Sequence, residues 1–191
     1  MFEICQLCKV LSNPLRLEIL THIYHTKEGF NFGLLVDKMQ KSKLCASGVS
    51  QYLKELERLG IIRRRREGCY VNYYADHSRA PHAVAEITSL IVEYTRKNKN
   101  HNLTCAFQAL MNPFRANVIR LLAQKSPLPA ETICEKTNHF SKYLKRDLLP
   151  ALKAGLITEN ATSGIYTTYS YVPPHDPILV CIMEHMLKSR G

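Results

Sequence analysis

A repeated pattern constrains the fold of this chain more than any single motif does. The segment LSNPLRLEIL near the N-terminus returns in altered form as LMNPFRANVI in the second half of the chain. The corresponding ranges are 11–20 with 110–119, 52–62 with 147–157, and 68–75 with 163–170. Repetition of apolar residues and turn residues at matching places indicates a duplicated module. The sequence therefore predicts two domains, residues 1–99 and 100–191.

Each copy contains an Asn-Pro pair that predicts the start of a helix. Asn13-Pro14 and Asn112-Pro113 combine an N-cap residue with a proline in the first turn, where its missing N–H is not needed. In the first copy, apolar spacing predicts one helix after Pro14 and a second over residues 34–39.

A third helix and a hairpin follow in the first copy. Val49, Leu53 and Leu56 recur on one helical face, and Gly60 predicts the end of that helix. The runs IIRRRR and CYVNYYA flank Glu67-Gly68 and predict a β-hairpin. Helix, helix, helix, hairpin is the order of a winged helix-turn-helix. The predicted fold class is mainly α with small β-hairpin wings, as two tandem winged helix-turn-helix domains.

The first copy resembles the DNA-binding module of the ArsR-type (arsenical-resistance repressor) family. The resemblance covers residues 11–75 and rests on LSNPLRLEIL, on SGVSQYLKELERLGIIRRRREG and on the tyrosine-rich strand that follows. It is faint over the second copy. It implies a two-fold dimer on operator DNA, with the third helix in the major groove and the wing beside the backbone. Many members release DNA when a metal or metalloid binds.

The polar face of the third helix supplies the predicted base and phosphate contacts. Ser47, Ser50 and Gln51 are short polar residues near its N-terminal end, and glutamine can pair bidentately with adenine. Lys54 suits a phosphate, and Arg58 continues the same face. The alternative is that this face is only solvated, since a fold by itself does not give a function.

Four consecutive arginines form the first strand of the predicted wing. Alternate residues of a strand point to opposite sides, so half of them are expected to face a DNA backbone. The phosphate pair is either Arg64 and Arg66 or Arg63 and Arg65.

The second copy has lost the small groups that would read bases. The positions that match the polar face of the third helix hold Lys142, Arg146, Leu149 and Lys153. Pro150 predicts a kink or an early end of this helix, and the matching wing over residues 158–169 has no arginine. A structural role or weak phosphate contact is therefore favoured over base reading.

A further helix is expected after each wing, with an apolar stripe along it. The stripes are Val84, Ile87, Ile91 and Tyr94 in the first copy, and Leu179, Ile182 and Met186 in the second. The resemblance implies that these helices form the dimer interface. Two arrangements stay open: an intramolecular pseudo-dimer, or a homodimer through first-copy residues that include Phe2, Ile4 and Leu7.

The ligand positions that the resemblance implies for a metal sensor hold mostly other residues. Those positions carry Asn31 and Gly33 in the second helix, and Asp76, Ser78 and Ser89 after the wing. Cys5 and Cys8 form a single C-x-x-C, which suits burial on one helix face as well as metal or redox sensing. We expect no metal site and no cofactor, with a sensor that uses Cys5 and Cys8 as an alternative.

Composition narrows the class of protein. A net charge of +10 suits double-stranded DNA as the partner. Seven cysteines, an odd number, and the lack of an apolar leader or a long apolar run predict a cytoplasmic protein with free thiols and no membrane contact. Motifs typical of enzymes are missing, so we expect no catalysis. A tandem winged-helix scaffold that binds proteins without specific DNA binding is the remaining alternative.

Overall fold

The computed structural model describes residues 1–26, 28–97, 103–161 and 167–188. The described chain is mainly helical, with two three-stranded antiparallel sheets. It divides into two compact units. The first unit is Asn13–Asn102, and the second unit joins Met1–Ser12 to Leu103–Gly191. The predicted boundary at residues 99 and 100 lies outside the described residues, as do residues 163–166 of the predicted repeat.

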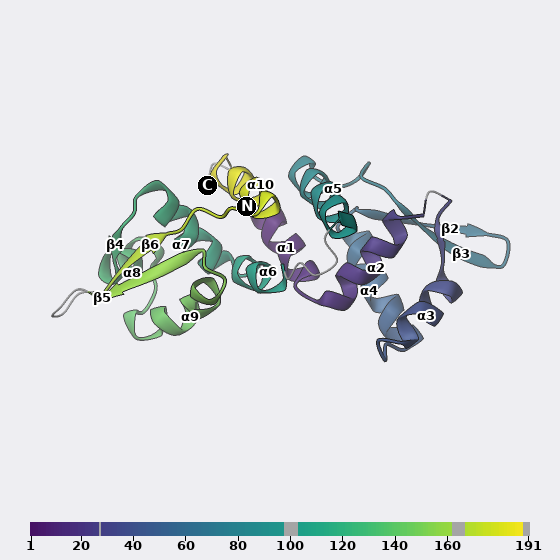
Figure 1. Cartoon of the computed structure of the whole chain (residues 1–191), viewed down its shortest axis with the longest axis horizontal. Helices are drawn as coiled ribbons and strands as arrows, with labels where there is room; N and C mark the ends of the chain where they lie inside the picture. Colours follow the sequence, from purple (N-terminus) through teal and green to yellow (C-terminus); the bar gives the residue numbers. More distant parts are fainter. Residues whose placement is uncertain (27, 98–102, 162–166, 189–191) are drawn as a thin grey trace. The chain divides into compact units, whose positions relative to one another are not determined.

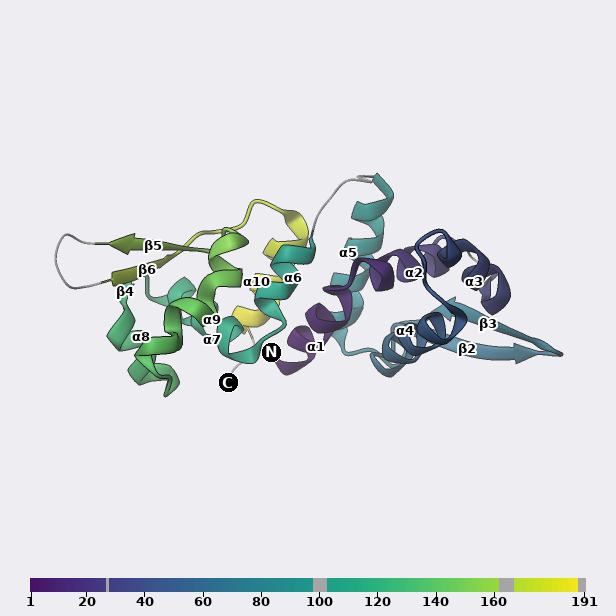
Figure 2. The same ribbon diagram turned by 90° about the horizontal axis from the view of Figure 1, so that it is seen from below.

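The first unit consists of helices that carry a small sheet. Its elements are α2 (Pro14–Tyr24), β1 (Phe30–Asn31), α3 (Phe32–Gln40), α4 (Ala46–Arg58), β2 (Ile62–Glu67), β3 (Tyr70–Ala75) and α5 (His82–Lys97). The strand order is β1-β3-β2. The hairpin of β2 and β3 extends beyond the helices of this unit in both views (Figure 1, Figure 2).

From α7 onward the second unit has the same order of elements as the first unit, and it contains two more helices, α1 and α6. Its elements are α1 (Phe2–Leu11), α6 (Thr104–Leu110), α7 (Pro113–Gln124), β4 (Leu128–Pro129), α8 (Ala130–Thr137), α9 (Ser141–Lys153), β5 (Ile157–Ala161), β6 (Thr167–Tyr171) and α10 (Pro177–Lys188). The strand order is β4-β6-β5, which matches the first sheet position by position.

The Asn-Pro pairs begin helices as predicted. The side-chain oxygen of Asn13 accepts a hydrogen bond from the backbone N–H of Leu15 at 2.9 Å, and Asn112 does the same for Phe114 at 2.9 Å. Each asparagine satisfies one backbone donor that the first helical turn leaves without an intrahelical partner.

Gly60 ends α4 and lets the chain pass close to another segment. Its φ of +74° is a left-handed conformation that favours glycine, and Val49, Leu53 and Leu56 before it are fully buried. A Cβ at Gly60 would stand 2.8 Å from the backbone carbon of Arg79. Both the conformation and the packing therefore require glycine here.

Of the two outcomes predicted for Pro150, a kink or an early end of the helix, the early end does not occur. The helix α9 continues through Pro150 to Lys153 and has the same length as α4, 13 residues. Ala151 and Leu148 on either side are buried, so packing of the apolar face maintains the helix despite the hydrogen bond that proline removes.

The helix α1 packs against α6 within the second unit (Figure 2). These helices precede the two Asn-Pro pairs, and they bury residues at matching positions. The buried sets are Leu7, Cys8, Val10 and Leu11 in α1, and Ala106, Phe107, Ala109 and Leu110 in α6. The two equivalent helices thus pack on each other through equivalent faces. This is the arrangement of an isologous interface, in which both partners contribute the same surface.

The burial of α1 bears on the homodimer considered from the sequence. Ile4 and Leu7 are buried and cannot form a contact with a second chain without leaving this core, whereas Phe2 is exposed. The helices after the hairpins pack within their own units, α5 on α2 and α10 on α7. Pairing between their apolar stripes stays a prediction.

Among the helices in the described part of the chain, none combines the length and the apolar character needed to cross a membrane.

Candidate nucleic-acid interface

The two faces of α4 differ as the sequence predicts. Ser47, Gln51, Lys54 and Arg58 are exposed, and Ser50 is half-buried. The opposite face is the buried one that fixes the helix to its unit. The exposed face therefore presents hydroxyl and amide groups near the N-terminal end and cations toward the C-terminal end.

Contacts to α2 hold α4 in place. The Asn13 side chain donates from Nδ2 to the Tyr52 hydroxyl at 3.1 Å, and the Arg16 guanidinium lies 4.8 Å from the centre of the Tyr52 ring. Glu55 approaches Arg16 at 3.8 Å and Arg58 at 3.9 Å. One carboxylate thus partly offsets the charge of Arg58, while Lys54 forms no ion pair within the described residues.

Cys45 stands immediately before α4 and was not identified from the sequence. Its exposed Sγ lies 3.1 Å from the Ser47 hydroxyl oxygen. The neighbouring Ser47 hydroxyl, and after it the backbone N–H of Gly48, lower the pKa of this thiol. A thiolate-prone sulfur therefore lies beside the residues expected to contact bases. The signal missed was the N-cap position itself, where short acceptors face helix N–H groups.

The register of the hairpin assigns each arginine of β2 to a face. Arg64 pairs with Tyr73, whose ring is buried, and Arg66 pairs with Val71 on the same face. The other face carries Arg63 and Arg65, because successive residues of a strand alternate.

Carboxylates compensate the positive charge on the face that carries Arg63 and Arg65. Arg63 lies 3.6 Å from Asp76, and Arg65 lies 3.5 Å from Glu67. Glu67 also accepts hydrogen bonds from the Tyr74 hydroxyl and the Asn72 side chain, both at 2.8 Å. These bonds lower the pKa of Glu67, and hydrogen bonds from Ser78 lower that of Asp76. Both groups are charged at neutral pH.

Arg64 and Arg66 keep their charge uncompensated. Neither forms an ion pair with any carboxylate in the described ranges, although the Arg66 Nε donates to the Gly68 carbonyl at 3.2 Å. Burial raises the pKa of Tyr73, and the neighbouring Arg64 opposes this rise. All four arginines are exposed. The sequence left two candidate arginine pairs. Arg63 and Arg65 have carboxylate partners, so Arg64 and Arg66 are the pair whose charge is not compensated.

The matching helix α9 presents a different surface. Lys142, Arg146, Leu149 and Lys153 are exposed at the predicted positions. Arg146 is bound to Asp147 at 3.0 Å, and no hydroxyl or amide side chain replaces Ser47 or Gln51 here. This surface offers charge and apolar area, and at the positions of Ser47 and Gln51 it has Lys142 and Arg146 in place of small polar groups.

The two N-terminal cysteines are buried on one face of α1. Burial raises the pKa of both Cys5 and Cys8, most strongly for Cys8. A metal ligand or a redox-active thiol must be a thiolate, so these surroundings favour packing over sensing for this pair.

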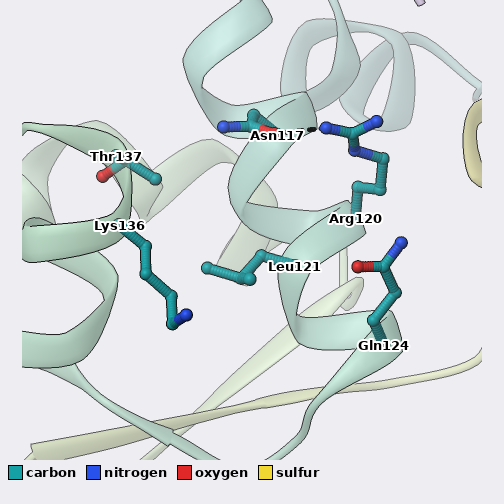
Figure 3. Close-up of a pocket in the computed structure, with 6 residues that line it drawn as sticks. All are labelled: Asn117, Arg120, Leu121, Gln124, Lys136 and Thr137. Carbon is teal, nitrogen blue, oxygen red and sulfur yellow. Dashed lines mark hydrogen bonds between the residues drawn. The ribbon is translucent and has the colours of Figure 1, made fainter. Parts of the chain in front are cut away.

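A polar pocket of about 320 Å³ lies between α7 and α8 (Figure 3). Its lining residues are Asn117, Arg120, Leu121, Gln124, Lys136 and Thr137. The guanidinium of Arg120 donates to the Asn117 side-chain oxygen at 3.1 Å. Two of its lining side chains, Arg120 and Lys136, are cationic, and the pocket belongs to the second unit.

No protein-family model, curated protein or solved structure matches this chain.

Proposed function

We propose that the chain is a sequence-specific double-stranded-DNA-binding protein, made of two tandem winged helix-turn-helix domains, and that it acts as a repressor-like transcriptional regulator. The observation that carries the proposal is the exposed polar face of α4 beside a hairpin with two uncompensated arginines. Because the two lie side by side, α4 and the hairpin can contact the same duplex, each in a different way.

The helix α4 suits the major groove. A recognition helix needs one face held by the domain and a second face with polar groups near its N-terminal end. Ser47, Ser50 and Gln51 provide the base-contacting groups, and Lys54 and Arg58 contact phosphates. The contacts of Tyr52 and Glu55 to α2 support this role, because they hold the helix in one orientation.

The hairpin supplies a second, sequence-independent contact. Arg64 and Arg66 bind phosphates of the flanking backbone, while Arg63 and Arg65 form the outer face with their carboxylate partners. Neutralisation of phosphates releases condensed counterions, which favours binding at low salt. The net charge of +10 supports the same conclusion.

A salt titration of duplex binding tests this proposal. The logarithm of the association constant should fall linearly with the logarithm of salt concentration. The Arg64→Ala/Arg66→Ala double variant should flatten that slope by about 1.8, or ~0.9 for each lost phosphate contact. Arg63→Ala/Arg65→Ala removes the same formal charge and should flatten it less.

Two results would contradict the proposal. Absence of binding at low salt would exclude the DNA function itself. Equal flattening by the two double variants would remove the assignment of Arg64 and Arg66 as the phosphate pair.

A second candidate, a scaffold that binds proteins, is favoured by one observation. The second unit exposes Phe140 and Leu149 on the surface that corresponds to the reading face of α4. The two functions can coexist, because the first unit and the second unit each provide one surface.

A further inference from the structure

The surface of α9 combines exposed apolar side chains with cations. Phe140, which precedes the helix, is 72% exposed, Leu149 is 44% exposed and Tyr143 is 36% exposed. The matching positions of the first unit hold Cys45, Lys54 and Gly48. The α9 surface is defined by Phe140, Lys142, Tyr143, Arg146, Leu149 and Lys153.

Two cationic side chains lie against the aromatic ring of Tyr143. The Lys142 Nζ and the Arg146 guanidinium carbon each lie 4.6 Å from the ring centre. The Tyr143 backbone N–H donates to the Phe140 carbonyl at 3.0 Å. The backbone at the start of α9 is thus ordered where both aromatic residues are attached.

The charge of the α9 surface is incompletely compensated. Arg146 binds Asp147 at 3.0 Å, and Lys145 next to the surface binds Glu159 at 3.0 Å. Lys142 and Lys153 form no ion pair with a carboxylate within the described residues. The surface therefore has surplus positive charge beside exposed apolar side chains.

We propose that the α9 surface binds an acidic segment of a partner protein that also carries apolar side chains. Leucine or phenylalanine side chains of the segment pack on Phe140 and Leu149, and its carboxylates face Lys142, Arg146 and Lys153. Aromatic residues and arginine are enriched in the energetically dominant parts of interfaces. Duplex DNA would satisfy the cations but offers few apolar groups, such as the thymine methyl, for Phe140 and Leu149 to pack on. This inference does not rest on DNA binding by the first unit.

Binding of a defined peptide to the full chain tests the inference. The probe is a fluorescein-labelled peptide in which glutamate and aspartate alternate with leucine and phenylalanine, measured by fluorescence anisotropy. The chain should bind it, and Phe140→Ala should weaken binding about tenfold. Tyr70→Ala is the matched control, because Tyr70 is a similarly exposed aromatic residue, at 63%, in the first unit; its affinity for the peptide should equal that of the wild type.

Further arms identify the contacts. Leu149→Ala removes the apolar contact without changing the charge of the surface, and it should also weaken peptide binding. A peptide with alanine in place of leucine and phenylalanine should bind about tenfold less tightly than the probe. Thermal unfolding of each variant should match the wild type, since the substituted side chains are exposed.

Three outcomes would overturn the inference. The first is no binding of the apolar acidic peptide. The second is equal binding of the alanine peptide, which would indicate charge attraction alone. The third is loss of oligothymidylate binding in Phe140→Ala without a change in peptide binding, which would make the surface a base-stacking site for single-stranded nucleic acid.

Discussion

At the scale of single residues, Gln51 and Lys54 on α4 have separable roles. Gln51→Ala should cost ~1–3 kcal/mol on the preferred duplex and little on random duplexes, because a bidentate amide contact distinguishes bases. Lys54→Ala should weaken binding to preferred and random duplexes equally, since a phosphate contact carries no sequence information. Competition titrations with labelled duplexes measure both. Equal losses on preferred and random duplexes for Gln51→Ala would remove it from base reading.

Cys45 should be alkylated at a lower pH than an ordinary thiol. Its pKa is lowered by hydrogen bonds to the sulfur, so alkylation by iodoacetamide should reach half its maximal rate at a lower pH than for an ordinary thiol. Buried Cys8, whose pKa is raised, should react only after unfolding. Mass spectrometry of adducts across a pH series measures this, with Cys45→Ser as the control. Saturating duplex should slow the reaction at Cys45. Equal labelling of Cys8 and Cys45 in the folded chain would contradict the account.

The sequence alone does not predict which arginines of β2 form ion pairs, because that depends on where the carboxylates lie in the folded hairpin. Alternation along β2 divides the arginines into two pairs, but it does not say which pair meets carboxylates. Glu67 and Asp76 lie at the two ends of the hairpin, and only the register brings them to Arg65 and Arg63. The sequence therefore leaves both arginine pairs as candidates for the phosphate contact, and the register and the ion pairs of the structure separate them.

At the scale of elements, Pro150 lies inside α9 against its local preference. Pro150→Ala should stabilise the second unit by about 1–2 kcal/mol. It restores a helical hydrogen bond and removes a ring clash, while the extra freedom it gives the unfolded chain offsets part of the gain. Urea unfolding followed by circular dichroism measures the change, with exposed Lys142→Ala as the control within about 0.5 kcal/mol. A loss of stability would show that proline suits the geometry of α9.

Elements with local signals are predictable from this sequence, and elements defined by contacts are not. The Asn-Pro pairs and Gly60 carry their own backbone preferences, and they begin and end helices as expected. The strands β1 and β4 have only two residues each, too few for any alternation, and they exist through pairing with β3 and β6. Tertiary packing likewise outweighs the local cost of Pro150.

At the scale of the whole molecule, α1 belongs to the core of the second unit. Leu7→Ala should therefore destabilise that unit by ~2–5 kcal/mol and reduce hydrogen-exchange protection in α6 and α7. Protection in α4 and β2 should change less. Leu53→Ala, equally buried but in α4, should give the reverse pattern. Loss of protection in α4 and β2 for Leu7→Ala would contradict the placement of α1.

The pairing of α1 with α6 also bears on assembly. A buried α1 leaves its Ile4 and Leu7 unavailable to a second chain, which argues against a homodimer through these two residues. No sequence pattern indicates that a segment at the N-terminus completes a core near the C-terminus, because the two are far apart along the chain and both are apolar. Such a contact is visible only in three dimensions.

The central claim is that the first unit reads duplex DNA and that the second unit does not. Selection of bound duplexes from a random pool by the wild-type chain, followed by sequencing, tests it most directly. We predict enrichment of one asymmetric motif, because the serine and glutamine side chains of α4 have no counterparts at the matching positions of α9, and loss of that enrichment in Gln51→Ala. A palindromic motif with two equal half-sites, or no enrichment over the starting pool, would contradict the account.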